Sequence, residues 1–216
     1  MQPLHPLEAV THSDPTLYYH HLAHTQPFYW DPHFGGWVAS SAEAVTDVLN
    51  SDFCRVRPVK EPIPSHLLGS AAGDLFGNWA RMNDGDLHRT LKGASTRALE
   101  TLTPLRISTE SQRWAELLFP LEQTPNTLEH LNSLCSNLPI YTVASLLGVL
   151  PAQLPKVAAL LHEFALCLSP LNTPPELERG KQAAERLQDF IQELLEHKES
   201  DGVLTVLARG LDHSEQ

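Results

Sequence analysis

Helical periodicity dominates the chain after about residue 80 and restricts it to a mainly α-helical fold. Apolar residues recur there at spacings of three and four in one segment after another, as in helices that bury one face. Gly148 and Pro151 stand where one such segment ends and the next begins, which is typical of helix termini. The predicted helices cover residues 86–99, 108–119, 126–147, 154–168, 175–198 and 201–210.

The clearest strand signal lies near the start of the chain. Aromatic and β-branched residues at 28–30 and 37–39 flank a turn at 31–36 that contains Pro and Gly, a pattern typical of a β-hairpin. A short helix over residues 14–24 is predicted before it, and Ser40 or Ser41 can cap a helix after it. The sequence therefore predicts a mainly α fold with a small N-terminal β-hairpin, as a single α-rich domain over residues 1–216.

Residues 59–78 interrupt the helical pattern. This segment contains Pro62, Pro64, Gly69, Gly73 and Gly77, and no apolar period is visible in it. A loop of this length is uncommon in a compact domain and usually has a function. We therefore expect a long variable loop within the domain.

Charge and composition exclude several classes of function. The net charge is −11, so the surface lacks the basic patch that phosphate binding requires, and nucleic acid is not an expected partner. No run of apolar residues is long enough to cross a membrane, and the first residues lack the features of a secretory signal. The three cysteines are too widely spaced for a disulfide framework or a metal knuckle. We expect a cytoplasmic protein.

Two pairs of side chains are candidates for ligand contacts. His88 and Lys92 lie four apart on a predicted helix and so share one face, which suits a bound carboxylate or phosphate; the alternative is a solvated helix face. His20 and His24 have the spacing of a zinc-binding pair, but no acidic third ligand is near. We therefore interpret them as exposed helix residues and predict no metal site.

The order of the motifs resembles the N-terminal half of a bacterial cytochrome P450. The resemblance rests on the hairpin with Phe28-Tyr29-Trp30 and Gly36-Trp37-Val38, followed by Phe53-Cys54-Arg55-Val56-Arg57-Pro58. It continues in the stretch from Met82 to Lys92 and in the pair Leu138-Pro139 and Leu146-Leu147-Gly148-Val149. Each motif is loose on its own, but together they follow the family's order and spacing over nearly the whole chain.

The resemblance implies a haem (heme) cofactor, with His88 and Lys92 at positions that contact the haem propionates. Lys92 stands where the family often has arginine, which keeps the charge but loses the bidentate geometry. It also implies that residues 59–78 roof a pocket for a small organic substrate. A haem-thiolate monooxygenase would receive its electrons from a redox partner.

The family's oxygen-activating helix and its cysteine ligand loop have no counterpart in this sequence. None of Cys54, Cys135 or Cys167 has the expected neighbours. We therefore expect the N-terminal part of such an enzyme, inactive without a C-terminal half, and an uncovered apolar face that binds that half or a second copy. The alternative is a non-catalytic module of the same fold that binds a small molecule or dimerises, with Leu187, Phe190 and Leu194 on its contact face.

Overall fold

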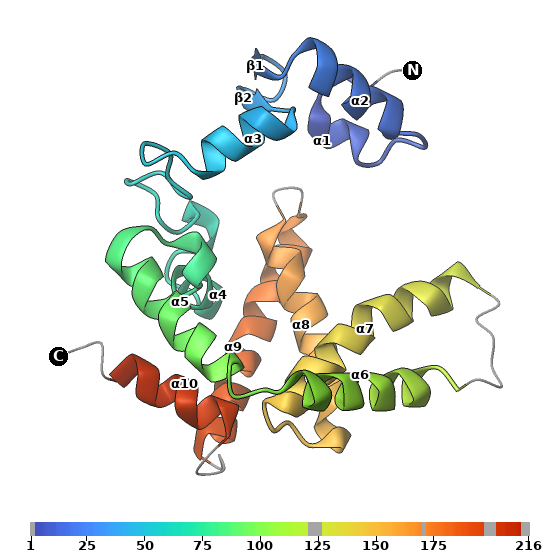
Figure 1. Ribbon diagram of the computed structural model, residues 1–216, viewed down its shortest axis with the longest axis vertical. Helices are drawn as coiled ribbons and strands as arrows, with labels where there is room; N and C mark the ends of the chain where they lie inside the picture. The colour runs from blue at the N-terminus through green and yellow to red at the C-terminus, as the bar shows by residue number, and fades with distance from the viewer. Residues whose placement is uncertain (1–2, 121–126, 170–171, 197–201, 213–216) are drawn as a thin grey trace. The chain divides into compact units, whose positions relative to one another are not determined.

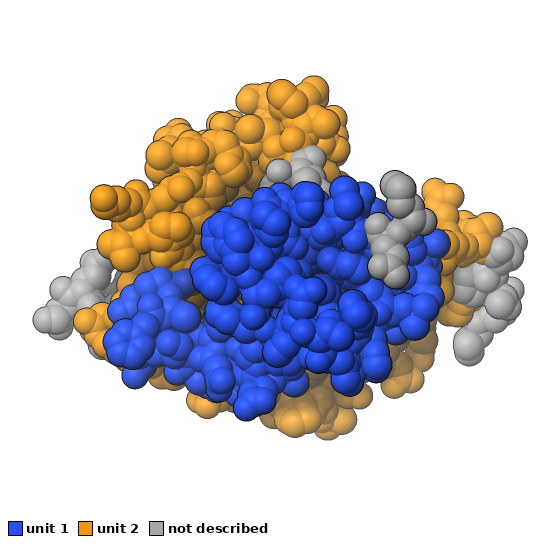
Figure 2. Space-filling view, turned by 90° about the horizontal axis from the view of Figure 1, so that it is seen from above, with its two compact units in different colours: residues 1–55 blue, residues 56–216 orange. Residues whose placement is uncertain are grey.

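The computed structural model describes residues 3–120, 127–169, 172–196 and 202–212. Its contacts group the chain into two compact units, residues 1–55 and residues 56–216, which Figure 2 colours separately. The sequence indicated one domain, and we describe each unit by itself. The structure is mainly helical with a small two-stranded antiparallel hairpin, which confirms the predicted class. In the described part of the chain, every helix is too short or too polar to span a bilayer.

Unit 1 combines short helices with the predicted hairpin (Figure 1). Phe28 pairs with Ala39 and Trp30 with Trp37 in the antiparallel register. The hydroxyl of Ser41 accepts a hydrogen bond from the Ala44 amide at 3.1 Å, so Ser41 caps the helix that follows the hairpin. The elements are α1 (Pro6–Ala9), α2 (Thr16–Thr25), β1 (Phe28–Asp31), β2 (Gly36–Ala39) and α3 (Ala42–Leu49).

The regular elements of unit 2 are all helices or 3₁₀ turns among its described residues. Its longest helix, α9, packs along α8 and also against α4 (Figure 1). One buried cluster lies where these three helices meet and contains Phe76, Phe164 and Leu187. The helices of this unit are α4 (Ala71–Gly77), α5 (Gly85–Leu99), α6 (Pro104–Leu118), α7 (Leu128–Leu146), α8 (Leu154–Leu168), α9 (Pro174–Glu196) and α10 (Val203–Asp212), with short 3₁₀ turns η1 (Ser65–Leu67), η2 (Ala80–Met82) and η3 (Pro151–Gln153).

A second buried cluster joins α6 and α7 to α8 and α9 through Trp114, Leu154 and Phe190. The chain turns sharply at the end of α7, where Gly148 has a φ of +94° that favours glycine. The Val149 amide donates to the Ala144 carbonyl and the Gly148 amide to the Ser145 carbonyl, both at 3.0 Å. This pair of bonds is a Schellman motif, so Gly148 is the helix-ending residue that the sequence predicted.

The expectation of a long loop over residues 59–78 is wrong in its second half. Residues Ala71–Gly77 form α4, and the hydroxyl of Ser70 caps it by accepting from the Gly73 amide at 3.3 Å. Ala71, Ala72 and Phe76 belong to the buried cluster of unit 2. A helix this short is stabilised by tertiary packing rather than by propensity, which explains why its sequence carries no helical period.

Thr142 on α7 is a buried polar residue of unit 2 and provides a test of the packing there. Its side chain is 7% exposed, and its hydroxyl has no hydrogen-bond partner among the described residues. Thr142→Val keeps the shape and removes the unpaired polar atom, so we expect the free energy of unfolding to rise by about 1 kcal/mol in urea denaturation. Thr101→Val is the control, because the Thr101 hydroxyl does donate to the Ala98 carbonyl at 2.7 Å. If Thr142→Val loses more stability than Thr101→Val, the Thr142 hydroxyl does have a hydrogen-bond partner and the prediction is wrong.

Candidate functional site

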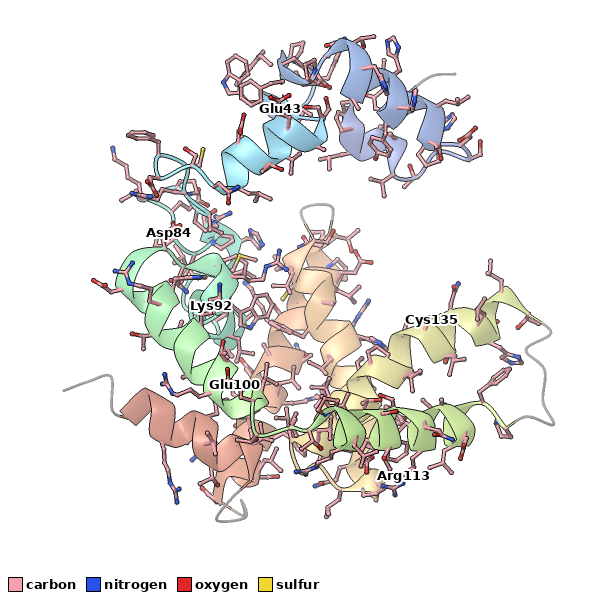
Figure 3. The ribbon with its side chains drawn as sticks, viewed as in Figure 1. Glu43, Asp84, Lys92, Glu100, Arg113 and Cys135 are labelled. Carbon is pink, nitrogen blue, oxygen red and sulfur yellow. The ribbon has the colours of Figure 1, made fainter. Side chains whose placement is uncertain are left out.

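Helix α5 positions His88 and Lys92. The helix begins at Gly85, whose φ of +64° is readily adopted only by glycine. Asp84, just before it, accepts a hydrogen bond from the Val56 amide at 3.3 Å and so connects the start of the helix to the chain entering unit 2. His88 is partly buried, and Lys92, which Figure 3 labels, is exposed one turn further along the helix.

The imidazole of His88 is held in a fixed orientation. Its Nδ1 lies 2.7 Å from the carbonyl oxygen of Ala80 in η2. Because a carbonyl oxygen only accepts, the proton is on Nδ1, and Nε2 is left for another partner. The Asn83 side chain donates to the carbonyls of Gly77 and Trp79 at 2.7 and 2.8 Å, which holds the same segment in place. His88 therefore makes a structural hydrogen bond with Nδ1, and no described residue hydrogen-bonds to its Nε2.

Lys92 has no hydrogen bond or ion pair with any described residue, whereas Arg89 on the same helix pairs with Asp86. A free ammonium one turn from a fixed imidazole can contact a carboxylate or phosphate group. The structure thus keeps the two predicted residues on one helix, as their spacing required.

The cysteines of unit 2 do not fit as iron ligands beside this pair. Cys167 is fully buried between α8 and α9, where its thiol donates to the Phe164 carbonyl at 3.0 Å. Burial raises the pKa of the Cys167 thiol, so the thiolate that would bind a metal is disfavoured. Cys135 is exposed on α7, far from Lys92 on α5 (Figure 3). The propionate-binding part of a haem site fits these residues, but the thiolate part does not.

His20 and His24 stack on each other on α2, with ring centroids 4.2 Å apart. The Nδ1 of His24 is 2.8 Å from the His20 carbonyl oxygen, which occupies one of the two available ring nitrogens of that residue. Among the described residues, no group of three or more His, Cys, Asp or Glu side chains is arranged to hold a metal ion.

The face expected to mediate dimerisation is buried inside unit 2. Leu187 and Phe190 are 4% and 6% exposed, and Leu194 packs against the second cluster. A cavity of about 480 Å³ lies near the end of this face, between α6, α7, α9 and α10. Leu150, Leu194 and Val203 line it, with Arg106 at its edge. Sequence reasoning missed this cavity because no single motif marks it; it forms only where four helices converge.

Comparison with known proteins adds no assignment to this geometry. No family model matches the chain, and no curated protein matches it.

Proposed function

We propose that this chain is the N-terminal part of a haem-thiolate monooxygenase of the cytochrome P450 kind, which oxidises a small organic substrate. The observation that carries the proposal is the pair on α5. The His88 ring is fixed by the Ala80 carbonyl, and the Lys92 ammonium has no partner among the described residues. Both residues stand at the positions of the motif that, by resemblance, contacts the haem propionates.

The roles of the two residues follow from their chemistry. His88 provides a hydrogen bond through Nε2, which donates when the ring is protonated, and Lys92 provides a charge that attracts carboxylates. A bound haem would supply the activation of dioxygen. The described residues of unit 2 do not offer a thiolate beside the pair, so the proposal assigns this chain cofactor contact and not the full reaction.

The test is a hemin titration followed by the absorbance of the bound haem. We expect His88→Ala combined with Lys92→Ala to weaken hemin binding by about tenfold, because two polar contacts to carboxylates are lost. The matched control is His162→Ala combined with Lys156→Ala. It removes the same two side-chain types from exposed positions on α8.

Hemin dimethyl ester separates a specific contact from general adhesion, because its propionates are neutral esters. With this probe, the double variant of α5 and the unchanged protein should bind equally well. If the α8 control weakens hemin binding as much as the α5 variant does, or if the ester shows the same tenfold difference as hemin, the propionate assignment is wrong.

The cavity in unit 2 favours a second candidate, a non-catalytic module that binds a small apolar molecule. Sites for small molecules are commonly concave and mostly apolar, with a few polar groups. In this cavity, leucine and valine residues provide the apolar lining and Arg106 provides a polar group. This candidate predicts the same hemin affinity for the unchanged protein and both double variants.

A further inference from the structure

Unit 1 contains a cavity of about 630 Å³ that no part of the proposed monooxygenase function uses. Every residue around it lies between Pro3 and His33, so it belongs to this unit alone. Its walls come from the N-terminal segment, from α2 and from β1 with the turn that follows it. The cavity is therefore a property of a single compact unit.

Three aromatic residues line this cavity: Tyr18 from α2, and Tyr29 and Trp30 from β1. The Tyr29 hydroxyl donates to Oδ2 of Asp31 at 3.2 Å and also hydrogen-bonds to the Tyr18 hydroxyl. This chain of hydrogen bonds connects α2 to the hairpin and fixes two of the three rings.

The charge of the cavity is negative. Asp14 and Asp31 line it. The first lysine or arginine of the sequence is Arg55, which is the last residue of unit 1. Asp31 is only 3% exposed, and its carboxylate accepts hydrogen bonds from the amides of His33 and Phe34, both at 2.9 Å. Hydrogen bonds from the Phe34 and His33 amides lower the pKa of Asp31, so it stays charged at neutral pH.

We propose that this cavity binds an organic ammonium ion. Aromatic faces attract a cation through their quadrupoles, and two carboxylates without a competing lysine or arginine add a negative potential. His12, His21 and His33 also line the cavity. The inference concerns unit 1 and does not depend on the proposed haem contact.

The test uses choline as the cation and 3,3-dimethylbutan-1-ol as its neutral isostere, at pH 8. Binding to the full chain is followed by the NMR shift of the Trp30 indole N–H. Because the two probes have nearly the same shape and differ in charge, we expect choline to bind about tenfold more tightly. Equal affinities for the two probes would overturn the proposal, as would the absence of saturable choline binding.

Two matched pairs of variants locate the site. Trp30→Leu should weaken choline binding about fivefold, whereas Trp37→Leu should not, although both variants break the same edge-to-face contact between these two rings. Asp14→Asn and Glu43→Gln each remove one negative charge from unit 1, but only Asp14 lines the cavity. In Asp14→Asn the amide oxygen can still accept from the Thr16 amide, so α2 keeps its start. An equal effect of both members of either pair would place choline outside this cavity.

Discussion

Gly180→Ala is expected to lower the free energy of unfolding by about 3 kcal/mol, which is at the upper end of the usual cost of overpacking. Gly180 lies inside α9 where that helix crosses α8. A Cβ atom at this position would stand 2.5 Å from the Cβ of Cys167 and 2.8 Å from its backbone nitrogen. Neither atom is the end of a flexible side chain, so the two helices would have to move apart. Urea denaturation followed by circular dichroism measures the effect.

Gly93→Ala is the matched control for this substitution. Gly93 lies inside α5, where a new Cβ would meet only the end of the Arg97 side chain, at 3.3 Å. Alanine improves helix propensity by up to about 1 kcal/mol at both positions, so the difference between the two variants isolates the steric effect. If Gly180→Ala is as stable as Gly93→Ala, α8 and α9 do not cross as closely as described.

The sequence predicted best those helices whose apolar period is long. The helix predicted over residues 154–168 coincides with α8, and that over 86–99 starts one residue after α5. The start of α6 was placed at residue 108, whereas Pro104 begins it and Thr103 caps it by accepting from the Arg106 amide. Thr followed by Pro is a recognisable start signal, so this error was avoidable. Helix α4 as a whole was harder to predict, because tertiary packing rather than an apolar period stabilises it.

The candidate site shows the same division between local and tertiary information. Helical spacing alone placed His88 and Lys92 on one face, since residues four apart are neighbours on a helix. The Ala80 carbonyl that fixes His88 comes from a separate 3₁₀ turn, and no spacing rule predicts that contact. Local patterns similarly suggested a free apolar stripe on α9, but Leu187 and Phe190 are covered by neighbouring helices. Periodicity identifies which face is apolar, and only the packing shows what covers it.

Trp114 connects α6 to α7, and we expect its removal to cause the second large loss in the free energy of unfolding. The ring is 6% exposed and lies edge-on to Tyr141, with centroids 5.4 Å apart. Its indole N–H donates to the hydroxyl of Ser145 at 3.0 Å. Trp114→Ala therefore removes a large apolar volume, an aromatic contact and a hydrogen bond together. We expect a loss of about 4 kcal/mol in the free energy of unfolding.

Trp114→Phe separates these contributions, because phenylalanine keeps a buried ring and loses the indole N–H. Ser145 keeps other partners, since its hydroxyl also lies 3.1 Å from Oε2 of Glu110 and from the Thr142 carbonyl. The double-mutant cycle of Trp114→Phe with Ser145→Ala should thus give a coupling energy of about 1 kcal/mol, the value of one neutral hydrogen bond. A coupling energy near zero would show that α6 is held by apolar contact alone. A loss below about 1 kcal/mol for Trp114→Ala would contradict the packing of α6 on α7 itself, because a buried indole cannot be removed from a close-packed cluster at so small a cost.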